Sequence, residues 1–158
     1  MQDIRLNSIG TVQEHQGQFS LKLETSWHSA LKGLEGFTHI HVLWWAHHMD
    51  TTNARSITVC EQPYKMGPEE LGIFSTRSPA RPNPIMITPV FVSHIDLENG
   101  MIHLPYIDAE PGSPILDIKP FHGSSDCIQN WAVPEWCSNW PKSVEESANF
   151  PWETVFNF

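Results

Sequence analysis

The chain has 158 residues, enough for one compact domain whose core needs no disulfide or metal to hold it together. Hydrophobic residues make up 40% of the chain and charged residues 17%, and the net charge is −9. This balance argues against a broad basic surface of the kind that binds nucleic acid through many phosphates. We therefore expect no DNA partner, and only local contact with any RNA.

The three cysteines form no CxxC pair, and an odd number is typical of reduced thiols in the cytosol. No apolar run approaches the ~20 residues of a membrane span. The start, Met1-Gln2-Asp3, lacks the basic and apolar regions of a signal peptide. These features predict a cytoplasmic protein with no membrane partner.

The first half of the chain predicts strands at residues 9–12 and 19–23, and apolar and polar residues alternate in the second of these. Thr25 or Ser26 can cap a short helix that ends near Gly33. Residues 39–46, HIHVLWWA, are rich in aromatic and β-branched side chains and predict a central strand. Residues 56–59 are a weaker strand candidate.

The second half predicts a strand at residues 72–75, followed by a proline-rich loop. Residues 85–94 form a long apolar run, in which Pro89 indicates an edge strand or a bulge. Asn99-Gly100 is typical of a hairpin turn leading into a strand at 101–107. A last strand is expected at 115–119.

Many short strands separated by turn residues favour a sandwich or a barrel. We expect an all-β fold, a single antiparallel β-barrel with short helices and a loop-rich C-terminal tail. Residues 1–121 are the expected barrel domain, and the tryptophan-rich, acidic residues 122–158 are expected to pack on that same domain.

This tail contains Trp131, Trp136, Trp140 and Trp152, and its single basic residue is Lys142. Burial is the usual role of such indoles, and a stacking platform for a nucleic-acid base is the alternative. Ser143 and Glu146 have the spacing of a helix capping box.

The strongest chemical signal is the segment FSTRSPARPNPIM, residues 74–86. Its three closely spaced prolines stiffen the backbone, so that Arg77, Arg81 and Asn83 are held on a rigid loop that can bind a carboxylate or phosphate. There is no G-x-G turn and no P-loop, which argues against a Rossmann-type nucleotide site.

A second segment runs from Asp108 to Pro120. Asp108 and Glu110 flank a turn and can accept hydrogen bonds from a ribose or an amine. Asp117 and Lys119 lie two residues apart and can share one face of a strand.

Together these segments resemble the TrmO (TsaA-like) family. FSTRSPARPNPIM is similar to the family's FATRSPxRPNPIG, PGSPILDIKPF to DGTPxLDIKPY, and GLEGFTHIHVL (residues 33–43) to GLEDFSHIWVL. The three motifs occur in the family's order, and the resemblance covers residues 7–121. The chain departs from the family in lacking a Pro-Arg-Gln motif at residues 13–18 and in having Pro111 and Met86 at motif positions.

The resemblance implies a β-barrel homodimer that binds S-adenosylmethionine and methylates N6 of threonylcarbamoyladenosine in tRNA. By motif position, the implied cofactor contacts are His47, His48, Arg77, Ile87, Ile107, Asp108, Ala109 and Glu110. Arg77, Arg81, Asn83 and Lys119 are candidates for positioning the acceptor. No catalytic base is recognisable, and no metal site is expected.

Two alternatives remain at this point. His39 and His41 can point the same way from one strand, as metal ligands do in cupin enzymes, with His47 and His48 nearby. The chain can also be an S-adenosylmethionine-binding protein without transferase activity, or a methyltransferase acting on a small molecule or a protein.

Overall fold

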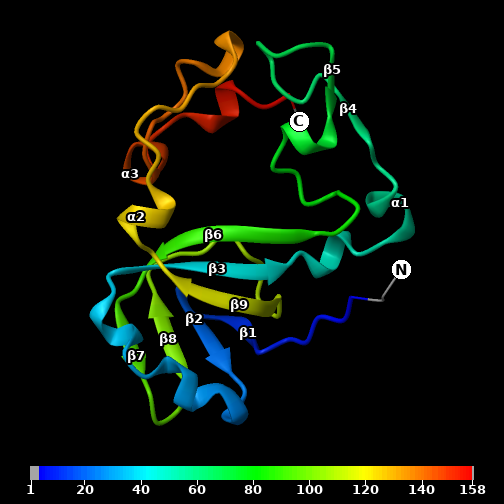
Figure 1. Ribbon diagram of the computed structural model, residues 1–158. Coiled ribbons are helices and arrows are strands. Elements are labelled where there is room, and N and C mark those ends of the chain that lie inside the picture. Colours follow the sequence, from blue (N-terminus) through cyan, green and yellow to red (C-terminus); the bar gives the residue numbers. More distant parts are fainter. Residues whose placement is uncertain (1–3, 158) are drawn as a thin grey trace.

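The computed structural model describes residues 4–157, which form two lobes (Figure 1). The larger lobe is a seven-stranded antiparallel sheet with the order β6-β3-β9-β1-β2-β8-β7. The strands of this sheet are β1 (Gly10–His15), β2 (Gln18–Leu23), β3 (His39–Trp45), β6 (Ile85–Phe91), β7 (His94–Asp96), β8 (Met101–Leu104) and β9 (Pro114–Pro120).

The smaller lobe lies above β6 in Figure 1 and combines the connection between β3 and β6 with the C-terminal segment. Its two-stranded sheet pairs β4 (Val59–Glu61) with β5 (Glu70–Gly72). The α-helices are α1 (Thr52–Arg55), α2 (Gly123–Asp126) and α3 (Val144–Ser147). Single 3-10 turns or short 3-10 helices lie at Thr25–Leu31, Leu34–Gly36, His47–Met49, Ile73–Ser75, Glu135–Cys137 and Trp152–Thr154.

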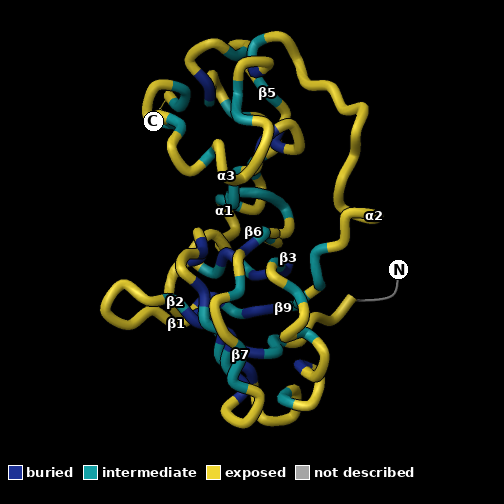
Figure 2. Tube along the Cα trace, turned by 90° about the vertical axis from the view of Figure 1, so that its left-hand side faces the viewer, coloured by how far each residue is buried: buried dark blue, intermediate teal, exposed yellow. Residues whose placement is uncertain are grey.

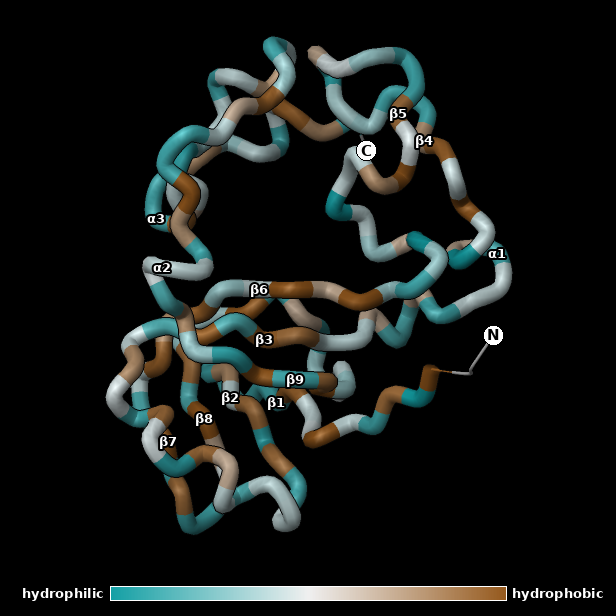
Figure 3. Tube along the Cα trace, viewed as in Figure 1, coloured by the Kyte–Doolittle hydropathy of each residue, from teal (hydrophilic) through white to brown (hydrophobic). Residues whose placement is uncertain are grey.

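The core lies inside the curled main sheet and consists of apolar residues, and Figure 3 shows hydrophobic stretches along the strands of this sheet. In β3, Ile40, Val42 and Trp44 point inward and are buried, whereas His39 and His41 point to the other face. This period of two is what a strand with one buried face requires. Figure 2 shows the same concentration of buried residues in the sheet.

The expected closed barrel is wrong, because the sheet is open. Among residues 4–157, β6 pairs only with β3, and β7 pairs only with β8. The two edge strands follow each other in the chain, with just Val92 and Ser93 between them. They therefore continue as one bent segment, in which the Val92 N–H donates to the Thr38 carbonyl before β3 and the Ser93 N–H donates to the His103 carbonyl of β8, so no turn returns β7 alongside β6. Pro89 adds to this, because it has no N–H to give to a strand on the free side.

Most expected strands are confirmed, including the central strand at His39–Trp45 and the edge position of the strand with Pro89. Three expectations need correction. The all-β description is too narrow, since 22% of residues are helical and 31% lie in strands. Residues 73–75 form a 3-10 turn, not a strand. The apolar run 85–94 divides at Val92 and Ser93 into β6 and the start of β7.

The smaller lobe has an aromatic cluster around the buried Tyr64. The Tyr64 ring stacks on Trp136 at a centroid distance of 5.2 Å and meets the edge of Trp140 at 5.0 Å. The end of the chain runs beside this tyrosine, where the Lys65 N–H donates to the Val155 carbonyl at 2.9 Å. The C-terminal segment is thus fastened to the connection between β3 and β6.

No helix among residues 4–157 is long and apolar enough to cross a membrane.

The turn between β7 and β8 depends on Gly100, which has a φ of +64° and lies against the imidazole of His28. A Cβ at this position would lie 2.1 Å from His28 Nε2. That ring is held in place between the carbonyls of Glu98 and Leu23, at 3.2 and 3.4 Å. Gly100 is therefore required both by its backbone conformation and by the space that it leaves.

We predict that Gly100→Ala lowers the free energy of unfolding more than Gly17→Ala does. Gly17 also has a positive φ, of +79°, but its Cβ would meet nothing within 4 Å. Gly17→Ala should cost about 1 kcal/mol of left-handed strain, and Gly100→Ala about 1–3 kcal/mol more from overpacking. Urea unfolding of both variants measures the difference, and equal losses would contradict the role given to His28.

Candidate functional site

A cleft of about 630 Å³ follows the unpaired edge of β6, between the two lobes. Its volume falls within the range of small-molecule sites. One wall is formed by the edge of the main sheet and its neighbours, namely His41, Arg77, Ile87, Thr88, Pro89, Tyr106 and Asp108. The opposite wall, called here the C-terminal wall, consists of Trp140, Pro141, Lys142, Ser143, Val144, Ser147 and Trp152.

The strand register explains why β6 can bind a ligand through its backbone. Hydrogen bonds join Val92 to Thr38 and Ala46 to Pro84 at the two ends of the β3–β6 pairing. Hydrogen-bonded and non-hydrogen-bonded pairs alternate along an antiparallel ladder, so the pair Ile87–Leu43 is a non-hydrogen-bonded one. In such a pair the N–H and C=O groups point away from the partner strand. The backbone N–H and C=O of Ile87 therefore face the free edge, towards the cleft.

Asp108 reaches this edge from the segment after β8. Its neighbours Ile107 and Ala109 are buried in the core, with 1% and 3% of their surface exposed, and fix the backbone. The Trp44 Nε1–H donates to the Thr88 hydroxyl at 3.0 Å, and that hydroxyl donates to the Asp108 carboxyl. Partial burial raises the pKa of Asp108 above its usual value, although the Thr88 bond and the Arg77 charge act in the lowering direction.

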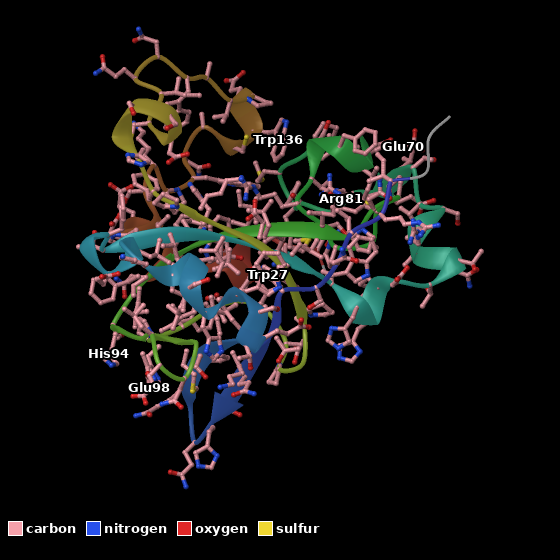
Figure 4. The ribbon with its side chains drawn as sticks, turned by 60° about the horizontal axis from the view of Figure 1, so that its bottom comes forward. Trp27, Glu70, Arg81, His94, Glu98 and Trp136 are labelled. Carbon is pink, nitrogen blue, oxygen red and sulfur yellow. The ribbon has the colours of Figure 1, made fainter. Side chains whose placement is uncertain are left out.

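Arg77 lies on the proline-rich loop between the 3-10 turn at Ile73–Ser75 and β6. Thr76 is buried and fixes this loop, because its hydroxyl donates to the Ile73 carbonyl at 2.9 Å and accepts from the Ser78 N–H at 3.2 Å. Arg81 is also occupied by the loop, since its Nη1 donates to the Thr76 and Ser78 carbonyls at 3.4 and 3.3 Å. Of the two arginines of this loop, Arg77 is therefore the one that lines the cleft. Figure 4 shows the position of Arg81.

The other expected contacts do not line this cleft. His47 Nδ1 is 3.3 Å from the hydroxyl of the buried Ser113, and the His47 and His48 rings lie 3.9 Å apart at the end of β3. Glu110 is exposed, and its carbonyl accepts from the Ser113 N–H at 3.0 Å. These residues therefore lie along the turn that precedes β9, at one end of the main sheet.

Asn83 and Lys119 belong to different cavities. The Asn83 side-chain carbonyl accepts from Arg55 at 3.3 Å, beside a cavity of about 600 Å³ that contains none of the implied cofactor contacts. Lys119 pairs with Asp117 at 2.7 Å on one strand face, as the spacing predicts, and this pairing raises the pKa of Lys119. Lys119 lines a cavity of about 560 Å³ that shares His41 and Ile87 with the edge cleft.

Part of the site was not expected from the sequence. Tyr106 and the C-terminal wall were not expected there, because no local pattern places them beside β6, whereas Thr88 was overlooked although it follows Ile87 in the expected strand. His41 was considered only as a metal ligand, and its Nε2 instead lies 3.4 Å from Asp126. Within residues 4–157 no group of three or more His, Cys, Asp or Glu side chains can hold a metal ion, so the cupin alternative has no support from the structure.

An open antiparallel sheet with an arginine, a carboxylate and free backbone groups along its unpaired edge defines a small-ligand-binding domain. The family described as the tRNA-methyltransferase O N-terminal domain matches residues 8–127, and the chain belongs to this family. The expected family is thereby confirmed.

Relatives of known name support the same membership. A probable S-adenosyl-L-methionine-binding protein of Methanothermobacter thermautotrophicus is 32% identical over 80% of this chain and 96% of its own length. A mouse tRNA (adenine(37)-N6)-methyltransferase is 36% identical over 66% of this chain, which spans only 23% of that enzyme. A crystal structure of TrmO from P. aeruginosa has a TM-score of 0.65 at 24% identity, with 85% of this chain and 62% of that chain covered, and shows a shared fold.

We predict that Asp108→Asn stabilises the protein at pH 7. Because folding raises the pKa of Asp108, the folded state favours the protonated carboxyl, and stability is lost as pH rises through the folded pKa. The amide removes this loss, so the gain should be present at pH 7 and shrink towards pH 4. The effect should stay below about 1 kcal/mol, since solvent screens the partly exposed carboxylate. Urea unfolding at both pH values measures it, and a less stable variant at pH 7 would contradict the sign.

Proposed function

We propose that this protein binds S-adenosylmethionine along the free edge of β6 and transfers its methyl group to N6 of adenosine 37 in tRNA. The observation that carries the proposal is that Arg77, Ile87 and Asp108 gather at one cleft in a member of this family. Relatives with these names, an S-adenosylmethionine-binding protein and a tRNA (adenine(37)-N6)-methyltransferase, support the cofactor and the acceptor. The threonylcarbamoyl form of the adenosine is the specific acceptor that we propose.

The residues present fit this cofactor. The Arg77 guanidinium suits the carboxylate of the methionine part, because its planar donors bind carboxylates in pairs. The free peptide groups of Ile87 can hydrogen-bond an adenine edge, and Asp108 can accept from the ribose hydroxyls or from the cofactor's amine. Ile107 and Ala109 contribute through their backbones, since their side chains belong to the core.

When bound, the cofactor supplies an activated methyl group on a sulfonium. The task of the protein is then to hold donor and acceptor in line and to exclude water. The cleft has the groups for such positioning, and the stiff loop at Arg77 adds little ordering cost. A carbamoylated N6–H is more acidic than a plain amine, and we assign no catalytic base.

The alternative, cofactor binding with a small-molecule or protein acceptor, is favoured by one observation, the net charge of −9. The decisive experiment uses cofactor with a labelled methyl group on total tRNA and, separately, on a metabolite extract and a protein extract. Label in tRNA at adenosine 37 supports the proposal. Label only in metabolites or proteins supports the alternative, and cofactor binding with no label anywhere indicates a binding protein.

We predict that S-adenosylmethionine raises the melting temperature of the wild type and that Arg77→Ala greatly reduces this shift. At a hundredfold excess over the dissociation constant, binding adds about 2.7 kcal/mol of stability. Arg77 is exposed on a loop, so its removal should change the stability of the free protein by less than about 0.5 kcal/mol. Thermal-shift titrations test both points. A ligand-free variant that melts far below the wild type would show that Arg77 is structural.

We further propose a homodimer in the cytoplasm. Two outward side chains of β6 that do not line the cleft, Ile85 and Phe91, are 39% and 47% exposed and offer apolar surface that a twofold partner can cover. We predict a mass by light scattering of twice the 18.0 kDa of one chain, with cofactor present. A single-chain mass at micromolar concentration would contradict this.

The cysteines Cys60, Cys127 and Cys137 are free thiols, which supports a reducing compartment.

A further inference from the structure

The C-terminal wall has no counterpart among the family motifs, since the family match ends at residue 127. It nevertheless forms one entire side of the cleft that contains Arg77 and Asp108. The residues from 122 onwards carry five acidic side chains and a single basic one, Lys142. The structure places this lysine in the C-terminal wall, across from the Arg77 loop.

Lys142 is held at this position by its backbone, which leaves its charge available. Its N–H donates to Glu146 Oε2 at 2.9 Å, and the Ser143 hydroxyl accepts from the Glu146 N–H at 3.1 Å at the start of α3. Within residues 4–157 the Lys142 ammonium has no ion pair and no hydrogen bond. A free ammonium on a fixed turn is suited to binding an anion.

The indoles beside Lys142 are also fixed. Trp140 and Trp152 meet edge to face at 5.5 Å, and Trp140 rests on Tyr64. The Trp152 Nε1–H is satisfied by the Ser147 carbonyl at 3.1 Å. With the Trp152 N–H bonded and each ring packed against an aromatic neighbour, the two indoles offer apolar surface to the cleft. Fixed aromatic surface is what stacks or covers a base in single-stranded RNA.

The side chains that line the cleft carry more positive than negative charge. Arg77 comes from one wall and Lys142 from the other, and Asp108 is the only carboxylate among the described residues that line it. The remaining titratable groups there are His41 and Tyr106. An acidic protein thus carries a local excess of positive charge at this cleft. One cation suits the carboxylate of the cofactor, and a second is left for another anion.

We propose that the C-terminal wall binds the methyl acceptor, with Lys142 holding an anionic group of the acceptor nucleotide and Trp140 and Trp152 contacting its base. This inference rests on the proposed function. The anion is a carboxylate or phosphate oxygen, which the N6 threonyl group or the RNA backbone can provide. Lys142 is therefore a substrate-binding residue of this chain, separate from the cofactor contacts.

The test compares the wild type with Lys142→Gln, Lys142→Arg and the control Lys65→Gln. Lys65 belongs to the same lobe, but its ammonium donates to the Glu153 carbonyl at 2.8 Å outside the cleft. Methyl transfer to tRNA gives KM and kcat, and calorimetry gives the cofactor dissociation constant. We expect Lys142→Gln to raise KM for tRNA about tenfold, equivalent to ~1.4 kcal/mol, with cofactor affinity and melting temperature unchanged. Lys142→Arg should stay near the wild type, and Lys65→Gln within about twofold.

Two substrates separate the sources of the anion. If Lys142 binds the threonyl carboxylate, Lys142→Gln weakens binding of tRNA that carries the N6 group and leaves binding of unmodified tRNA unchanged. If it binds a phosphate, both tRNAs bind more weakly, and the slope of log affinity against log salt falls by about 0.7. Either result supports the proposal.

Other results would overturn it. An active wild type with an unchanged KM in Lys142→Gln refutes the role of Lys142 and leaves the proposed function standing. A tenfold loss of cofactor affinity in that variant means that Lys142 binds the cofactor carboxylate instead. A wild type that binds cofactor and methylates no tRNA refutes the proposed function itself, and the inference falls with it.

Discussion

The free edge of β6 is the feature on which the rest of this structure depends. Val92 and Ser93 carry the chain directly from β6 into β7 while their N–H groups donate to Thr38 and His103, so the two outer strands pair with inner strands and not with each other. The peptide groups of Ile87 are left without a strand partner, and unpaired backbone groups need a hydrogen-bonding partner when water is excluded. The site is therefore located where the sheet does not close.

The surroundings of this edge come from distant parts of the chain. The loop with Arg77 precedes β6, whereas Asp108 follows β8 and is fixed by buried neighbours. The Trp44–Thr88–Asp108 chain of hydrogen bonds links the core of the sheet to the carboxylate. These contacts and the buried neighbours of Asp108 restrain its backbone and carboxyl before any ligand arrives, which lowers the ordering cost of binding.

The second lobe is held together by the packing of several large indoles. Trp136 and Trp140 pack on Tyr64, which belongs to the connection between β3 and β6, and the chain end pairs with the residues beside it. This packing brings the C-terminal segment across the gap above β6 (Figure 1). The acidic charge of the segment stays mostly in solvent, while its one lysine faces the cleft. A protein of net charge −9 thereby keeps a positively charged recess.

The sequence by itself determined the strands of the sheet and the family. The aromatic and β-branched residues at 39–46, the proline at position 89 and the motif around Arg77 are local patterns, and strand propensity or a fixed φ acts within a few residues. Tertiary structure alone decided that the sheet stays open, that Arg81 folds back on its own loop while Arg77 faces the cleft, and that Lys142 lies opposite it. The physical reason is that edge pairing and the packing of Trp140 on Tyr64 join residues far apart in the chain, where local periodicity has no influence.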